Sequence, residues 1–289
     1  MEDGTQVGYA TRVEEGGSFR LAGIDPSENG GLDESEAEQR LAELTAELRE
    51  LQELMFAAET NGIVVILQGM DASGKDVTIG NVFAAADPAS CRVAAFKEPT
   101  PEEQAHHFLW RADQLTPGHG ELVIFDRSYY EQVILPQVHD ELSEDEIQRR
   151  FTNINDFERL LHEHGIIVVK VFLHVSEEEQ GKRLEEREAS LETAWKISPR
   201  DWQERQFWDA YMAAFEATIN ASACPHAPWY VTPADHQWFH NLAVAEALVE
   251  HLRPYRKRWI EDRNQRGKEQ RAEAERARKS AERGDDGDN

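Results

Sequence analysis

The chain has 289 residues and a mass of 33.0 kDa, and 40% of its residues are hydrophobic, which is enough for one sizeable core. Its 56 acidic residues outnumber its 31 lysines and arginines and give a formal net charge of −25. This charge argues against a large nucleic-acid interface, because DNA and RNA attract basic proteins. Two cysteines are too few for a disulfide framework, and no apolar run approaches the roughly 20 residues of a membrane span. We therefore expect a cytoplasmic protein that binds neither nucleic acid nor membrane.

Residues 1–60 are expected to form an N-terminal arm followed by an amphipathic helix. Residues 1–33 are rich in Gly, Asp and Glu and are interpreted as an irregular arm. Asp33 and Glu36 fit the capping box that begins a helix. Leucines then recur at helical spacing up to about Glu59. We favour a helix that packs on the domain over a coiled coil, because the repeat spans too few heptads.

From residue 61 to residue 262, apolar strands alternate with helical stretches. The predicted strands are GIVVILQ, CRVAAF, ELVIF, IIVVKVFLHV and PWYVT. The predicted helices lie at about residues 75–86, 101–115, 143–163, 176–188, 200–222 and 236–262. This alternation predicts an α/β fold in which helices cover both faces of a parallel sheet. Residues 263–289 are nearly all charged or small, so we expect a frayed extension of the preceding helix that passes into a disordered, charged tail.

The segment GMDASGKD follows the first predicted strand and precedes a helix. This is the context of a phosphate-binding loop, in which glycines permit a tight turn and backbone N–H groups point at phosphate. Position 76 is Asp where such loops carry Ser or Thr, so the hydroxyl that holds magnesium is absent and Asp71 is a candidate substitute ligand. The alternative is a strand–helix turn that contains glycines by chance. The candidate phosphate-binding residues of this loop are Gly69, Ser73, Gly74, Lys75 and Asp76.

A second segment, FDRSYYE, begins at the carboxyl end of the third predicted strand. In phosphate-loop folds the acid at that place holds magnesium, which makes Asp126 a candidate ligand. Glu131 could assist through the water shell of the metal. Arg127 follows Asp126 directly, and its planar guanidinium could clamp a phosphoryl group. The alternative is an Asp that caps a helix beside a surface Arg, but the loop at 69–76 in the expected strand order favours catalysis.

Further basic residues lie near predicted strand ends, which face the binding crevice of an open α/β sheet, or in the neighbouring helices. Lys170 interrupts a buried run and needs an anionic partner, either substrate or one of Asp126 and Glu131. Arg183 and Arg187 lie one helical turn apart and could instead pair with neighbouring Glu residues at the surface. The candidate ligands for phosphate or polyphosphate are Lys97, Arg111, Lys170, Arg183 and Arg187.

These segments resemble the polyphosphate kinase type 2 family. The resemblance extends from Phe19 to Asn241 and rests on LQGMDASGKD, FKEPTPEE, HHFLWR, PGHGELVIFDRSYYE, KVFLHVSEEEQGKRL and APWYVTPAD. It implies a P-loop kinase-like fold similar to that of thymidylate kinases, with a helical lid at about residues 177–199. It also implies phosphoryl transfer between polyphosphate and a nucleoside mono- or diphosphate, converting AMP to ADP and ADP to ATP. Magnesium is the implied cofactor, with manganese as a substitute.

The resemblance assigns catalytic roles to Asp71 and Lys75 in the loop and to Asp126 and Arg127 in the second segment. Magnesium held by Asp71 and Asp126 would then bridge the reacting oxygens. The sequence departs from the family at Val77, which replaces a glycine, and at His107, where an acid is expected. Its related subgroup often has Asn in place of Asp126. We expect adenine nucleotides, and also guanine nucleotides, as substrates of a homo-oligomeric enzyme.

Two other functions are compatible with a phosphate loop. The first is an ATP-dependent nucleotide kinase of thymidylate-kinase type, which composition cannot distinguish from a polyphosphate-dependent enzyme. The second is a non-catalytic nucleotide-binding switch. The sequence lacks the N-K-x-D motif that reads guanine and the loop hydroxyl that switch proteins use for magnesium, so we disfavour a switch.

Overall fold

The computed structural model describes residues 4–196 and 198–285. Within this part of the chain, a seven-stranded sheet runs in the order β1-β2-β7-β6-β3-β5-β4. The strands are β1 (Thr5–Val7), β2 (Ala10–Val13), β3 (Gly62–Gln68), β4 (Cys91–Ala95), β5 (Leu122–Asp126), β6 (Ile166–His174) and β7 (Trp229–Pro233). Strands β3 to β7 pair in parallel and confirm the five predicted strands. Every residue of β3 and β6 is buried, as their continuous apolar sequences require.

The sequence predicts an irregular N-terminal arm, but part of this arm is ordered as two strands. Strands β1 and β2 form a hairpin, and β2 pairs antiparallel with β7, so the sheet is mixed. Gly8 in the turn has φ +58, a conformation that favours glycine. The Tyr9 N–H, which also lies in the turn, donates to Glu246 Oε2 at 2.9 Å. Strands of three and four residues are too short to show an alternating pattern, and their pairing with a distant strand has no local signal.

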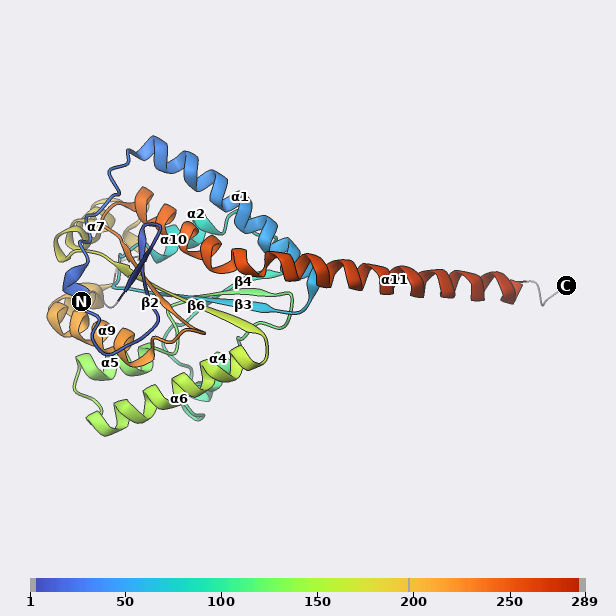
Figure 1. Cartoon of the computed structure of the whole chain (residues 1–289). Coiled ribbons are helices and arrows are strands. Elements are labelled where there is room, and N and C mark those ends of the chain that lie inside the picture. Colours follow the sequence, from blue (N-terminus) through green and yellow to red (C-terminus); the bar gives the residue numbers. More distant parts are fainter. Residues whose placement is uncertain (1–3, 197, 286–289) are drawn as a thin grey trace.

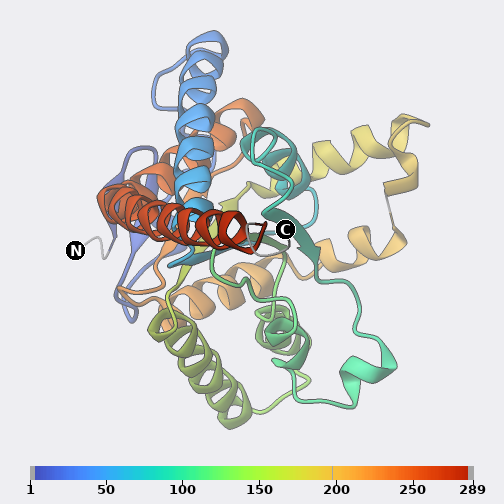
Figure 2. The same cartoon turned by 90° about the vertical axis from the view of Figure 1, so that its right-hand side faces the viewer.

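Two helical layers cover the sheet (Figures 1 and 2). Helices α1, α2 and α10 pack together on one face, and α5, α6 and α9 pack together on the other. The short helices α3 and α4 precede β5, and α7 and α8 precede α9. The bounds are α1 (Glu34–Ala58), α2 (Lys75–Val82), α3 (Pro101–Gln104), α4 (Trp110–Asp113), α5 (Glu131–Val138), α6 (Glu144–Glu163), α7 (Glu177–Ala189), α8 (Pro199–Arg205), α9 (Trp208–Ser222), α10 (Gln237–Leu252) and α11 (Arg256–Asp285).

Helix α1 begins as the sequence predicts. The Asp33 side chain accepts a hydrogen bond from the Glu36 N–H, and the Glu36 side chain accepts one from the Asp33 N–H, which completes the capping box. The helix ends at Ala58, next to Glu59 in a left-handed conformation. Three predicted helices are interrupted: residues 101–115 hold only α3 and α4, residues 200–222 are divided into α8 and α9, and residues 236–262 are divided into α10 and α11 by a 3-10 turn at Arg253–Tyr255. Helix α5 was not predicted, and it contains Pro136.

Helix α11 is longer than the frayed extension that we expect: it remains helical to Asp285, and residues 286–289 of the expected tail lie outside the described residues. Its first turns are anchored: the buried Trp259 donates from Nε1 to Asn61 Oδ1 at 2.9 Å, and Arg266 donates to Ala57 O at 3.0 Å. Further along, the helix projects away from the body (Figure 1). Its residues are mainly Arg, Lys, Glu, Gln and Ala, which have high helix propensity, and pairs such as Arg271–Glu275 at i,i+4 add to it. None of the described helices is both long and apolar enough to cross a bilayer.

Candidate active site

The phosphate loop connects β3 to α2. Gly69 and Gly74 have φ values of +154 and +106, and a Cβ on Gly74 would lie 2.5 Å from the His240 ring, so glycine is required there. Lys75 is buried and folds back over the loop, where its Nζ donates to Gly69 O and Met70 O at 2.9 Å each. Burial lowers the pKa of Lys75, and the nearby charge of Arg127 lowers it further. The loop therefore has the strand–turn–helix form that the sequence predicts.

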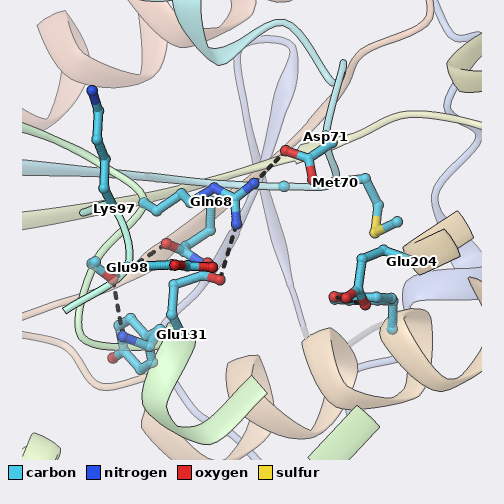
Figure 3. A network of polar contacts seen from close by, with 12 residues as sticks. Gln68, Met70, Asp71, Lys97, Glu98, Glu131 and Glu204 are labelled. Carbon is cyan, nitrogen blue, oxygen red and sulfur yellow. Dashed lines mark hydrogen bonds and ion pairs between the residues drawn. The ribbon is translucent and has the colours of Figure 1, made fainter. Parts of the chain in front are cut away.

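The second segment reaches the same edge of the sheet because β5 pairs with β3, with Asp126 in register with Leu67. Arg127 has φ +60, an uncommon conformation for a residue with a Cβ. Its side chain extends between two carboxylates: it is ion-paired with Asp71 of the phosphate loop and donates from Nη1 to Glu131 Oε2 at 3.2 Å. Figure 3 shows Asp71 and Glu131 directed toward the guanidinium between them. The two predicted segments are thus joined through Arg127.

These contacts fix the charge states of the cluster. Burial would raise the pKa of Asp71, but the charges of Arg127, Lys75 and Arg187 hold it below its ordinary value. Burial likewise opposes the charge of Arg127, yet the carboxylates of Glu131 and Asp71 raise its pKa. Asp71 is therefore ionised, and Arg127 charged, at neutral pH. The cluster presents both an anionic oxygen and a guanidinium to one cavity.

That cavity has a volume of about 490 Å³ and is lined by Asp71, Asp126, Arg127 and Glu131 on one side. Lys97 and Arg111 also line it, and Lys97 is exposed, as expected for a residue near the end of β4. Arg111 is buried to 8% exposure and donates from Nη1 to Lys97 O at 2.8 Å, while its guanidinium lies 4.6 Å from the centre of the Phe96 ring. Two of the five further basic residues therefore reach the cavity wall.

Arg187 is half-buried on α7, and within the described residues it forms no ion pair. Its charge contributes to the lowered pKa of both Asp71 and Asp76, so it lies near the phosphate loop. Asp76 itself is ion-paired with Lys196 at 2.9 Å. The Ser73 hydroxyl is buried and, among the residues described, has no hydrogen-bond partner. Arg187 and the loop positions stay candidate phosphate ligands.

Lys170 is not at the site, and its prediction as a phosphate ligand is wrong. The side chain is fully buried, and Nζ donates to Glu158 Oε2 at 2.7 Å, Ser222 O at 2.7 Å and Tyr130 OH at 3.2 Å. Its acidic partner is Glu158 of α6, and neither Asp126 nor Glu131. The physical reason is position along β6: Lys170 lies in mid-strand, beside Ile66 of β3. It is therefore well short of the carboxyl edge.

Arg183 does not line the cavity either. It pairs with Glu179 at 2.9 Å, as the alternative expected, but the pair involves a buried arginine and does not lie at the surface. Arg183 is 6% exposed, and its guanidinium donates to backbone carbonyls of the phosphate loop and of the β7–α10 connection. Because Gln180, Arg183 and Leu184 lie on the buried face of α7, the side chain points inward. Its prediction as a direct phosphate ligand is therefore wrong.

The expected lid at residues 177–199 comprises α7 and a 3-10 turn at Ala194–Lys196, and residue 197 lies outside the described residues. Two cavity residues that follow the expected lid, Arg200 and Glu204 of α8, were not predicted from the sequence. Glu204 of α8 lines the cavity (Figure 3) and accepts hydrogen bonds from His139 Nε2 at 3.0 Å and Tyr211 OH at 2.8 Å. Arg200, one turn before it, donates to Glu98 Oε1 at 2.8 Å. The i,i+4 spacing of Arg200 and Glu204 was the available signal, but it is equally typical of a solvated helix face.

A magnesium ion would find only part of its coordination shell on the protein. Among the described residues no group of three or more His, Cys, Asp or Glu side chains could hold a metal. Mg²⁺ in phosphoryl-transfer sites is commonly held by one or two carboxylates, with substrate phosphates and water completing the octahedron. Asp71 and Asp126, which line one cavity, fit that arrangement. Glu131 is less available, because its carboxylate also accepts from Gln68 Nε2 at 3.0 Å and from Arg127.

Comparisons with known proteins agree with this geometry. Residues 31–259 match the family model described as polyphosphate kinase 2. The chain is 42% identical over 243 residues to the AMP/ADP-polyphosphate phosphotransferase of Meiothermus ruber, covering 83% of this chain and 91% of that protein. It is 36% identical over 234 residues to the ADP-polyphosphate phosphotransferase of Rhodopseudomonas palustris, covering 77% and 81%. The crystal structure of polyphosphate kinase 2 from Arthrobacter aurescens TC1 superposes with a TM-score of 0.80 at 39% identity, covering 83% and 87%.

Proposed function

The chain belongs to the polyphosphate kinase 2 family and has its P-loop kinase-like fold, and from this premise we propose which reaction it catalyses. It transfers a phosphoryl group between inorganic polyphosphate and adenine nucleotides, converting AMP to ADP and ADP to ATP, with magnesium as cofactor. The observation that carries this proposal is the junction of the phosphate loop and the second segment through Asp71 and Arg127 at one cavity. Two similar proteins, from M. ruber and R. palustris, are named for ADP as a substrate, and the first also for AMP.

Phosphoryl transfer requires in-line positioning and neutralisation of charge more than covalent chemistry. The loop backbone and Lys75 hold the phosphates that are exchanged, and Arg127 stabilises charge on the group in transit. Asp71 and Asp126 would hold magnesium, which supplies charge neutralisation between the reacting phosphates. The terminal phosphate of a nucleotide is already largely ionised near neutral pH, so no strong general base is required. Asp71, whose pKa is lowered, acts as a ligand and orienting group.

We place the nucleoside of the acceptor in a neighbouring cavity of about 950 Å³, which shares Pro99, Arg111 and Gln132 with the first. Its charged side chains balance, three arginines against three carboxylates, which suits a neutral nucleoside better than a polyanion. Phe108 and His106 contribute aromatic surface, and the His106 ring stacks on Trp110 at 4.2 Å. The remaining charged lining residues are Glu103, Glu146, Arg150, Asp156 and Arg159.

A matrix of donors against acceptors tests the proposal. Purified protein is incubated with polyphosphate or ATP as donor and with AMP, ADP, GMP or GDP as acceptor, with and without Mg²⁺. We expect ADP and ATP to accumulate from AMP and polyphosphate when magnesium is present. Transfer from ATP but not from polyphosphate would instead support a nucleotide kinase of thymidylate-kinase type. Products that stop at ADP would restrict the acceptor to AMP, and full activity in a chelator would remove the metal from the proposal.

A further inference from the structure

Helix α7 holds the back of the phosphate loop through Arg183. All five N–H groups of this guanidinium are used. Nη1 donates to Ala72 O at 3.2 Å and to Ser73 O at 3.1 Å, and Nη2 donates to Ala234 O at 2.7 Å and to Asp235 O at 2.8 Å. Nε donates to Glu179 Oε1 at 2.9 Å. The side chain therefore has no donor left for a phosphate oxygen.

Gln180 lies on the same face of α7 and contacts the loop carbonyl that precedes those held by Arg183. Its Nε2 donates to Asp71 O at 3.1 Å, and its Oε1 accepts from Arg205 Nη1 at 2.7 Å. Gln180 is fully buried. Together with Arg183 it binds the carbonyls of three successive loop residues, Asp71, Ala72 and Ser73.

Holding these carbonyls sets the direction of the loop N–H groups. In a trans peptide the carbonyl of one residue and the N–H of the next point in opposite directions. Carbonyls drawn toward α7 therefore turn the following peptide N–H groups away from the helix. Ala72 has φ +64, a conformation that a non-glycine residue adopts at an energetic cost unless its surroundings enforce it. The arginine fork supplies that constraint with charge-assisted hydrogen bonds.

The far end of the contact is also fixed. Ala234 and Asp235 directly follow β7, and the Asp235 carboxylate accepts from the Ser176 N–H at 2.7 Å, at the start of α7. Arg183 thus ties the loop to the sheet through a second rigid segment. Helix α7 is therefore joined both to the phosphate loop and to the β7–α10 connection.

We propose that Arg183 is a positioning residue, which orients the phosphate loop by capturing its carbonyls and never contacts the phosphates, with Gln180 in the same role. This inference rests on the proposed function, because it assigns the loop to phosphate binding. A positioning role for Arg183 can be distinguished from direct phosphate binding by one substitution. A direct phosphate ligand acts by its charge, which lysine would preserve, whereas a carbonyl clamp acts by a planar fork of five donors, which lysine does not have.

The experiment compares Arg183→Lys and Arg183→Gln with Lys182→Gln. Lys182 is exposed on the same helix and pairs with Glu178 at 2.8 Å, so its variant removes the same charge without touching the loop. For each protein we would measure kcat, the KM for polyphosphate over a range of salt concentrations, and hydrogen exchange of the backbone amides of residues 69–75. Circular dichroism and thermal unfolding identify variants that do not fold.

We expect Arg183→Lys to be nearly as impaired as Arg183→Gln. Both substitutions remove charge-assisted hydrogen bonds to the loop carbonyls, so the loop loses its fixed orientation and kcat should fall by at least about tenfold in both. Exchange of the loop amides should accelerate by about tenfold or more. The dependence of KM on salt should not change, because no phosphate contact is removed. Lys182→Gln should match the wild-type protein in every measurement.

A direct phosphate contact would give a different outcome. Arg183→Lys would then retain most activity, loop exchange would be unchanged, and the salt dependence would weaken in Arg183→Gln alone. If neither Arg183 variant folds, Gln180→Leu replaces them, with the same accelerated exchange and a smaller loss of kcat expected. Unchanged exchange and kcat in Gln180→Leu would overturn the proposal. A wild-type protein that is inactive with polyphosphate would instead refute the proposed function, and the exchange measurement would still test the clamp.

Discussion

Lys170 and Arg127 each pair with a carboxylate from another element, Glu158 of α6 and Asp71 of the phosphate loop, but Lys170 is enclosed in the core whereas Arg127 is open to the cavity. Lys170 and Glu158 have fully buried side chains, and the ammonium donates to three acceptors, which is its full capacity. Arg127 is 31% exposed, and its side chain makes two contacts among the described residues, to Asp71 and Glu131. Three of its five N–H groups therefore remain for a ligand.

The comparison distinguishes two clusters. In the closed cluster, Lys170 and Glu158 stabilise the fold, whereas in the open cluster Arg127, with Asp71 and Glu131, can contact a ligand. Glu158 also accepts from the hydroxyls of Tyr129 and Tyr130 at 2.7 Å each, and burial together with its charge raises the pKa of both tyrosines well above the ordinary value. These tyrosines lie in the same segment as Arg127. The closed cluster therefore supports the backbone from which the open one extends.

The largest expected effect is on stability, at the closed cluster. Lys170→Met leaves the Glu158 carboxylate buried without its cation, and removal of one partner of a buried pair costs about 3–5 kcal/mol. Denaturant unfolding at neutral pH should show a loss of this size. Arg49→Met, which breaks the exposed pair of Arg49 with Glu53, should change the unfolding free energy very little, because water and salt screen an exposed ion pair. A similar small loss in Lys170→Met would contradict the distinction between the two clusters.

At the open cluster the expected effect is on rate. Asp126→Ala removes a carboxylate from the cavity wall and should lower kcat by at least about a hundredfold, equivalent to about 3 kcal/mol of barrier, while the unfolding free energy changes little. Lys75→Ala should have a comparable effect on rate. Asp113→Ala, at an exposed acid on α4, is the matched control. Near-normal turnover in a folded Asp126→Ala protein would remove that residue from the mechanism.

The smallest expected effect concerns a cation at the edge of the open cluster. Arg187→Gln should weaken polyphosphate binding a few-fold and reduce the slope of log KM against log salt by about 0.7, the value for one phosphate contact on a single strand. Arg49→Gln, at an exposed charge far along α1, should leave the slope unchanged. If both variants keep the wild-type slope, Arg187 does not contact the polyanion.

Sequence patterns predicted what depends on local order. Strand, glycine turn and helix follow one another at residues 62–82, and Asp126 ends a strand, so the order of residues alone locates both candidate site segments. The same patterns predicted β3 to β7, because strands buried on both faces are recognisable from their own residues. They also predicted that Lys97 and Arg111 lie at the crevice of the sheet, and both residues line the cavity.

The sequence could not predict which side chains from separate elements contact each other in the folded protein. Lys170 clearly needed an acid, but its partner Glu158 lies in helix α6 and resembles a surface residue. A signal was present: Glu158 continues the buried stripe of Ile147, Phe151 and Ile154 at helical spacing, where an apolar residue is expected. Arg183 is a second example. An arginine among glutamates is typical of a solvent-exposed helix face, but the Arg183 side chain points toward the phosphate loop.

Helix α11 has a consequence for how this protein behaves in solution. At about 1.5 Å per residue, its 30 residues form a rod of about 45 Å, most of which extends beyond the body (Figure 1). Such a rod increases translational friction without adding much mass. A single copy should therefore elute from a gel-filtration column ahead of a spherical protein of 33.0 kDa. Elution volume alone would suggest self-association, so our expectation of a homo-oligomer is to be judged by light scattering or sedimentation equilibrium, which report mass independently of shape.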